Sequence, residues 1–231
     1  YVLLVVLLTM IASSLVFGAA ENSEKLDLLP EYRLPDNAED LLRMDDAMRE
    51  YFSARINQQA PFLTKLDQIS EAILGEENLH FRYEGKGVYD VREAFRRRRG
   101  NCMTYSMLTI AVAREFGVKA KFNEVRNDPE WNRSGGIVLV NGHINVRVEN
   151  WPESYELDLK INEELLASRR SAREVSDARA FAGVYSSAGV HRLAKGEWAE
   201  AMLLLERATV IDPKALPAWT NLGSAFVKLD Q

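Results

Sequence analysis

The feature that most constrains the fold is an apolar helical pattern over residues 102–116, which begins at the only cysteine of the 231-residue chain. Apolar side chains cover a wide arc of this helix, so we expect it to lie in the centre of the fold, largely buried. Gly117 follows the pattern and is predicted to end the helix. Cys102 therefore stands at the amino-terminal end of a buried helix.

The position of Cys102 bears on its chemistry. A lone cysteine is most often a small, buried apolar residue. At a helix amino terminus, however, unpaired N–H groups and the helix dipole favour the thiolate, which is the nucleophilic form. The four arginines of residues 96–99 are interpreted as a solvated basic turn whose charge also favours a thiolate nearby. Cys102 is therefore a candidate nucleophile if a base lies near it.

Alternating apolar and polar residues predict strands over residues 119–125, 137–140, 142–148 and 155–160, with a polar loop over residues 127–136. If the last two strands form a hairpin about Asn150-Trp151-Pro152-Glu153, the numbers of opposed residues add to roughly 303. His143 and Asp158 then share the polar face as diagonal neighbours, roughly 7–8 Å apart at their Cα atoms. An imidazole can reach a carboxylate over that distance, and a cysteine nucleophile requires such an oriented base.

Four segments resemble the transglutaminase-like superfamily, over about residues 62–165: Gly100-Asn101-Cys102-Met103-Thr104-Tyr105-Ser106, Ala113-Arg114-Glu115-Phe116-Gly117-Val118, Gly142-His143 and Leu157-Asp158. This resemblance implies an α+β, papain-related fold, in which a helix with the nucleophilic cysteine at its amino end packs on an antiparallel sheet. It also implies Cys102 as nucleophile, His143 as general base and acid, and Asp158 as the residue that orients the imidazole.

Two helices are predicted before the cysteine, over residues 39–57 and 61–74, and a short helix over residues 91–97 is predicted to be capped by Asp90. Beyond about Arg173 the pattern is helical throughout. We divide the chain into residues 1–20, a signal peptide or membrane anchor; 21–38, a linker; 39–172, the transglutaminase-like domain; and 173–231, an all-α repeat region.

A period of 34 residues separates Tyr185 from Trp219 and Gly189 from Gly223. This period resembles the tetratricopeptide repeat, which implies helical pairs with a surface for a protein partner. Stacked repeats need several copies, and this chain ends within the second, so we expect the natural protein to continue.

Residues 1–20 carry no charge and end in small residues that are followed by polar ones, as in a signal peptide cleaved after Ala20. Twenty apolar residues also just span a bilayer, so a membrane anchor through residues 1–20 is the alternative. Both predict an exported protein, periplasmic or extracellular.

The net charge and the few cysteine and histidine residues disfavour several classes of function. The net charge of −5 disfavours a nucleic-acid partner, and one cysteine with three scattered histidines predicts neither a metal site nor a cofactor. We predict a cysteine acyl-transfer enzyme that acts on protein or peptide amides through a thioester. Water as acceptor makes it a peptidase or amidase, and an amine makes it a transferase. The alternative is a non-catalytic scaffold that supports the repeats, whereas a redox protein is disfavoured because a resolving cysteine is lacking.

Overall fold

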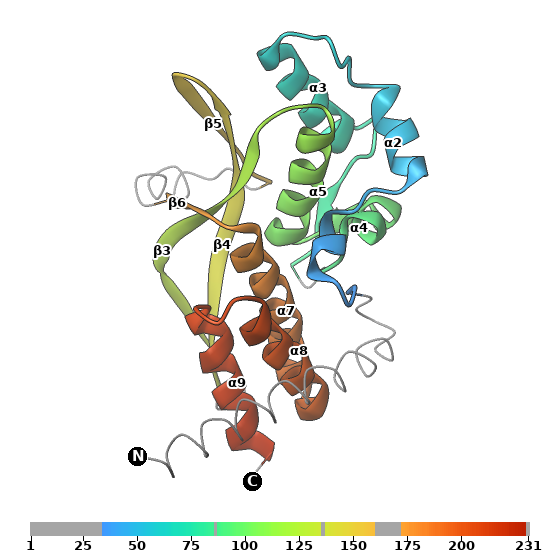
Figure 1. The fold of residues 1–231 in the computed structure, drawn as a ribbon. Helices are drawn as coiled ribbons and strands as arrows, with labels where there is room; N and C mark the ends of the chain where they lie inside the picture. The colour runs from blue at the N-terminus through green and yellow to red at the C-terminus, as the bar shows by residue number, and fades with distance from the viewer. Residues whose placement is uncertain (1–33, 86, 135–136, 160–171, 230–231) are drawn as a thin grey trace, which may run out of the picture.

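The computed structural model describes residues 34–85, 87–134, 137–159 and 172–229, and Figure 1 shows their course. The elements, in chain order, are the 3-10 helix η1 (Ala38–Leu42), helices α2 (Asp46–Ser53) and α3 (Phe62–Leu74), strand β1 (Arg82–Tyr83), helix α4 (Val91–Arg97), strand β2 (Arg99–Gly100), helix α5 (Cys102–Glu115), strands β3 (Ala120–Ser134), β4 (Ile137–Asn150), β5 (Glu153–Leu157) and β6 (Ala172–Val175), and helices α7 (Asp177–Lys195), α8 (Trp198–Ile211) and α9 (Leu216–Leu229). This mixture of helices and an antiparallel sheet agrees with the predicted α+β class.

The main sheet has four antiparallel strands in the order β5-β4-β3-β6, while β1 and β2 form a two-residue parallel pair. Helices α2 to α5 lie beside one half of this sheet and α7 to α9 beside the other half (Figure 1). The central helix α5 packs against β3 and β4, and also against α3, α4 and α7. The sheet and α5 together therefore position the residues that the sequence singles out.

The prediction of a central helix is confirmed. All residues from Thr104 to Ala113 in α5 are buried, and most of its apolar side chains belong to the main core. The helix ends where expected, because Gly117 adopts a φ of 74°, a left-handed conformation that glycine tolerates without strain.

The predicted hairpin between β4 and β5 is also confirmed in register. Val146 pairs with Leu157 and Arg147 with Glu156, which is the pairing that alternation implied. The register follows from the side-chain period of two, since a slip of one residue would move the apolar Val146 and Val148 to the polar face that carries His143 and Arg147.

The loop predicted over residues 127–136 is wrong as far as residue 134. Strand β3 continues to Ser134, which pairs with Ile137 of β4. The register shifts between Val125 and Glu130, and Pro129, which has no N–H to donate, lies inside that shift. Local turn residues therefore mark an irregularity in a long hairpin, and the backbone pairing resumes beyond it.

The single helix predicted over residues 39–57 is also wrong, because η1 and α2 are separate. Asp45 caps α2 by accepting a hydrogen bond from the Met48 N–H at 3.0 Å. Leu41 and Met48 are fully buried on either side of the break, so the apolar period runs through it and conceals it. The predicted helices α3 and α4 are confirmed, and Asp90 caps α4 through the Glu93 N–H at 2.8 Å.

The prediction that the chain is helical throughout beyond about Arg173 is wrong at its start. Residues 172–175 form β6, which pairs with β3, and helix begins only at Asp177. Helix α7 also shares the main core, since Phe181 stacks edge-on against Phe122 of β3 at 6.2 Å between ring centroids. Four residues of β6 lack a distinctive pattern of their own, and only their pairing with β3 makes them a strand.

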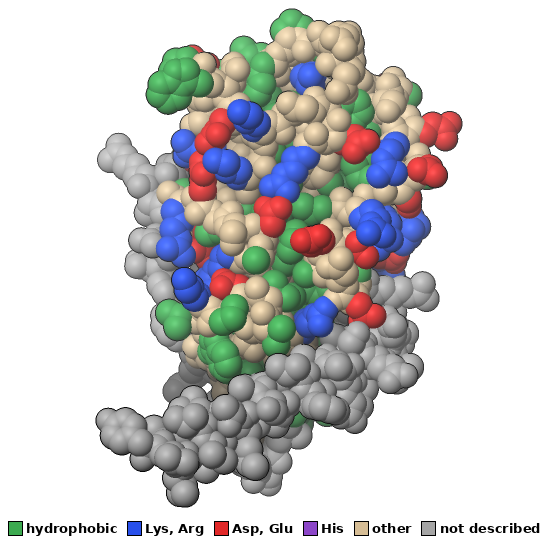
Figure 2. Space-filling model, viewed as in Figure 1, with side chains coloured by type: hydrophobic (Ala, Val, Ile, Leu, Met, Phe, Trp, Pro, Cys, Tyr) green, Lys and Arg blue, Asp and Glu red, His purple; other side chains and the backbone are tan. Residues whose placement is uncertain are grey.

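The charged side chains on the face shown in Figure 2 are mixed in sign, with basic and acidic groups interspersed. Among the described residues, several charged side chains form ion pairs, such as Arg114 with Asp177 at 2.6 Å and Lys121 with Glu174 at 2.8 Å. Within the described ranges, no helix combines the length and apolar character needed to cross a membrane. The predicted signal peptide or anchor, residues 1–20, lies outside those ranges.

Candidate active site

Cys102 is the first residue of α5, and Asn101 before it is the helix cap. The Asn101 side chain accepts a hydrogen bond from the Thr104 N–H at 3.0 Å, which sets the start of the helix at the cysteine. Cys102 is a free, half-buried thiol. Its sulfur therefore stands at the positive end of the helix dipole, where a negative charge is stabilised.

The turn before Cys102 is held by buried hydrogen bonds. The Thr104 hydroxyl donates to the Gly87 carbonyl at 3.0 Å and accepts from the Tyr89 N–H at 3.2 Å. The Asn101 N–H donates to the same Gly87 carbonyl at 2.8 Å. These bonds fix Thr104, and with it the position of the first turn of α5.

Gly100→Ala is expected to destabilise the protein, because a Cβ at residue 100 would lie 2.4 Å from Cγ2 and 2.6 Å from Cβ of Thr104. Thr104 cannot retreat without breaking its buried hydrogen bonds, so we expect a loss of about 1–3 kcal/mol in the free energy of unfolding. Urea unfolding measures it. The control is Gly223→Ala in α9, where nothing lies within 4 Å of the added Cβ and a gain of about 0.5–1 kcal/mol is expected. Equal stabilities for the two variants would contradict this account.

His143 and Asp158 meet at the end of the β4–β5 hairpin. The His143 Nε2 atom lies 2.7 Å from Oδ2 of Asp158, and the two side chains are 17% and 2% exposed. Burial by itself lowers the pKa of His143, but the hydrogen bond to Asp158 and the proximity of Cys102 and of the Asp158 charge outweigh it and raise the pKa to about 10. The imidazole is therefore held in its protonated form at neutral pH.

Cys102 completes this cluster, because its side chain lies close enough to the His143 imidazole to help raise the histidine pKa. Since Nε2 is bonded to Asp158, Nδ1 is the ring nitrogen left for the sulfur. The Ser106 hydroxyl donates to the Ile144 carbonyl at 3.4 Å and so joins α5 to β4 beside the histidine. The structure thus brings together all three residues that the sequence analysis singled out.

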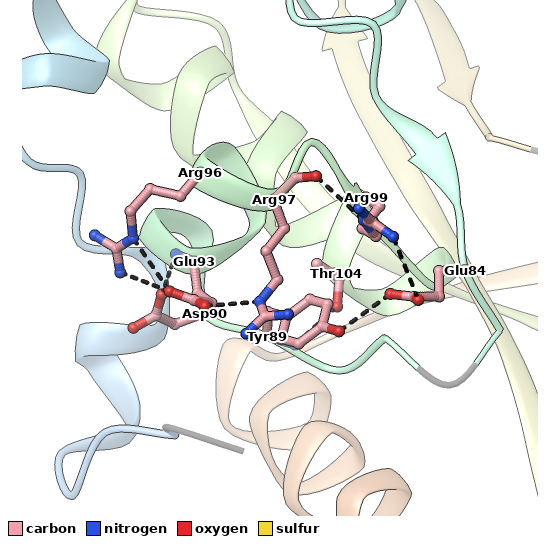
Figure 3. Close-up of polar contacts among 8 residues, drawn as sticks. All are labelled: Glu84, Tyr89, Asp90, Glu93, Arg96, Arg97, Arg99 and Thr104. Atoms are coloured by element: carbon pink, nitrogen blue, oxygen red, sulfur yellow. Dashed lines mark hydrogen bonds and ion pairs between the residues drawn. The ribbon is translucent and has the colours of Figure 1, made fainter. Parts of the chain in front are cut away.

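The arginines of residues 96–99 lie close to Cys102 in sequence, but Arg96, Arg97 and Arg99 make their contacts with carboxylates, an aromatic ring and a backbone carbonyl. Arg96 and Arg97 both bond Glu93, at 2.9 and 2.6 Å, and the Arg99 guanidinium lies 3.9 Å from Glu84 (Figure 3). Arg97 also lies over the Tyr89 ring, 4.8 Å from its centroid. Three of the four arginines therefore face carboxylates of their own neighbourhood, and these contacts do not support the second role predicted for the turn, stabilisation of a thiolate at Cys102.

Sequence reasoning missed three buried polar residues around the cluster. Tyr105 of α5 lies close to Asp158, and burial, together with the Asp158 charge, raises its pKa to about 12. Asn123 and Asn145 pair across β3 and β4 with 0% and 2% exposure. Alternation places Asn145 on the face of His143, but no local signal shows that this face is covered.

A helix with a cysteine at its amino end, packed on an antiparallel sheet that carries a hydrogen-bonded histidine and aspartate, defines a class: α+β proteins with a Cys-His-Asp cluster. Residues 50–201, from α2 into α8, match the family model described as the transglutaminase-like superfamily. The chain belongs to that superfamily. Searches of curated proteins and of solved structures found no match. In the described ranges, no three His, Cys, Asp or Glu side chains are grouped as metal ligands.

Proposed function

We propose that this protein is a cysteine-dependent acyl-transfer enzyme that acts on amide groups of proteins or peptides. The observation that carries the proposal is the hydrogen-bonded pair of His143 and Asp158, which lies beside Cys102 at the amino end of a buried helix. A nucleophile, a base and a group that orients the base are the parts that covalent catalysis requires.

In the first half of the reaction the Cys102 sulfur attacks the amide carbon. The C–N bond breaks as a thioester forms, and the leaving amine takes a proton from the His143 imidazolium. The Cys102 N–H is the first of the helix and has no partner within it, so it is a candidate donor to the oxyanion. Asp158 holds the imidazole by its Nε2 atom throughout, which keeps Nδ1 toward the sulfur.

In the second half an acceptor replaces the sulfur. His143 removes a proton from water or from an incoming amine, which attacks the thioester, and the thiolate leaves. Water gives a peptidase or amidase, and an amine gives a cross-linking transferase. Both use the same three side chains in the same order.

Rapid alkylation of Cys102 by iodoacetamide is expected at a pH well below about 8.5, the ordinary pKa of a free thiol. The imidazolium of His143, whose pKa is raised to about 10, stays charged through neutral pH and stabilises the thiolate. Mass spectrometry of the modified protein as a function of pH measures the rate. A thiol that reacts only above that pH would favour the alternative, a non-catalytic scaffold.

We further propose that α7–α9 form a tetratricopeptide-like surface for a protein partner. A Cβ at Gly189 of α7 would lie 2.7 Å from Cγ of Leu205, so α8 packs closely on this glycine. Gly223, the corresponding residue 34 positions on in α9, has no atom within 4 Å of such a Cβ. Trp219 and Phe226 on α9 are each 47% exposed. These features support a helix of a partner protein as the ligand of this surface. Export of the protein is a separate prediction, which rests on residues 1–20.

A further inference from the structure

A row of buried amides crosses the sheet next to His143 and Asp158. Asn123 of β3 lies directly opposite Asn145 of β4, and its Nδ2 donates to the Asn145 Oδ1 at 2.9 Å. That bond fixes the orientation of the second amide, since its oxygen is engaged toward β3. The Asn145 Nδ2 therefore points toward β5, where it donates to the Glu156 carboxylate at 3.4 Å.

The register places Asn145 beside both members of the pair. It follows His143 by two residues and so lies on the same face of β4. The pairing of β4 with β5 ends at Val146 and Leu157. If the same register is continued by one residue, Asn145 lies opposite Asp158. The Asn145 side chain thus occupies the place on the sheet between the imidazole, the Asp158 carboxylate and Glu156.

Stability alone does not explain these amides. Asn123 and Asn145 are 0% and 2% exposed, and within the described part of the chain Oδ1 of Asn123 is buried without a hydrogen-bond partner. A buried acceptor that lacks a donor lowers stability, and a pair of apolar residues of similar shape would avoid the loss. Polar side chains kept in such a place beside a reactive pair indicate a positioning role.

We propose that Asn145, held by Asn123, is a positioning residue that keeps the Asp158 carboxylate on Nε2 of His143. This inference rests on the proposed function and deepens it. The amide directs its donor toward the Glu156 carboxylate of β5, and the same register places Asn145 directly opposite Asp158. Asn145 acts through Asp158 and His143, and it needs no contact with the substrate.

The titratable and charged groups around His143 and Asp158 come from three elements. Cys102 and Tyr105 belong to α5, Glu156 lies in β5, and Arg147 of β4 lies on the same face, directly opposite Glu156. The amides contribute no charge of their own. A change at Asn145 therefore acts on Cys102 and His143 through the geometry of the sheet, which is visible in the pH profile of Cys102 alkylation.

The experiment compares Asn145→Ala and Asn145→Leu with the wild-type protein, by the rate of iodoacetamide alkylation of Cys102 between pH 5 and 10. At pH 7 we expect the rate to fall by at least about tenfold in both variants, with the rise of the profile displaced to higher pH. The leucine variant fills the same space without a donor, so it separates the hydrogen bond from packing. Asn123→Ala is expected to act in the same direction by about threefold, since it frees the Asn145 amide to rotate.

The matched control is Asn221→Ala in α9. Asn221 is 1% exposed, donates one hydrogen bond to Ser186 at 3.2 Å and also has a buried Oδ1 without a partner in the described ranges. Its loss should lower thermal stability and leave the alkylation profile unchanged. If the wild-type thiol reacts near neutral pH and the folded Asn145 variants show the same alkylation profile, this inference is wrong while the proposed function stands. A wild-type thiol that reacts only above about pH 8.5 overturns the proposed function as well.

Discussion

Cys102→Ala is expected to abolish both incorporation of a labelled amine into glutamine-containing peptides and cleavage of those peptides, by at least about 10³-fold. No other cysteine exists in the chain to take its place. The Cys102 sulfur is the atom that forms the thioester, so its removal leaves His143 and Asp158 without a nucleophile to activate. The measurement is mass spectrometry of a peptide library incubated with the protein and the amine.

The control for this variant is Asp46→Ala, which changes the first residue of α2 and only an exposed contact with Arg49 at 3.3 Å. It should keep full activity. Cysteine-dependent amine incorporation in the wild-type protein indicates a transferase, and cleavage alone indicates a peptidase or amidase. If the wild-type protein forms neither product, or if the wild-type protein and Cys102→Ala form equal amounts, the catalytic proposal is wrong and the scaffold is favoured.

Asp158→Asn is expected to lower turnover by about 10²–10⁴-fold while the protein stays folded. The variant keeps the size of a side chain that is only 2% exposed, but it removes the charge that accepts the Nε2 hydrogen bond at 2.7 Å. An amide can also present N–H₂ to Nε2, which favours the wrong tautomer of the ring. The base then loses its orientation toward the sulfur.

The raised pKa of His143 determines how the Asp158→Asn variant should change the pH dependence of Cys102 alkylation. In the wild-type protein the His143 pKa is raised to about 10, so the imidazolium persists through neutral pH and stabilises the thiolate. Without the Asp158 charge that pKa falls, and the ring becomes neutral at a lower pH. Alkylation of Cys102 in Asp158→Asn should therefore lose its neutral-pH reactivity and rise only in the alkaline range.

The matched control is Asp177→Asn, another aspartate that bonds a cationic side chain. Asp177 pairs with Arg114 at 2.6 Å, in an ion pair whose two side chains are 38% and 41% exposed. Such an exposed pair contributes little to stability, so turnover and the alkylation profile should both stay as in the wild-type protein. A profile of Asp158→Asn that coincides with the wild-type profile would remove Asp158 from the mechanism.

Several structural features were predictable because their causes are local. Asp90 caps α4 through its own side chain, and Cys102 begins α5 because Asn101 before it accepts the Thr104 N–H. The β4–β5 register was predictable as well, because alternation over one short hairpin fixes which residues face each other. From that register alone His143 and Asp158 could be placed within reach of each other.

Features that depend on distant contacts escaped prediction. The strand over residues 127–134 exists because β4 pairs with it beyond an irregular stretch, and β6 exists because β3 offers it an edge. The helix over residues 39–57 is interrupted although its apolar period continues. In each case a local pattern was overridden by a hydrogen-bond partner or a cap that only the folded chain provides.

The sequence by itself determined a buried helix with a cysteine at its amino end, and a hairpin that places a histidine and an aspartate on one face. Periodicity and capping are short-range effects, so they can be inferred from neighbouring residues. Only the tertiary structure decided that α5 packs where its first residue meets His143, and that Asn123 and Asn145 are buried beside the pair. Burial and contact between distant elements depend on how the whole core packs, which no local pattern encodes.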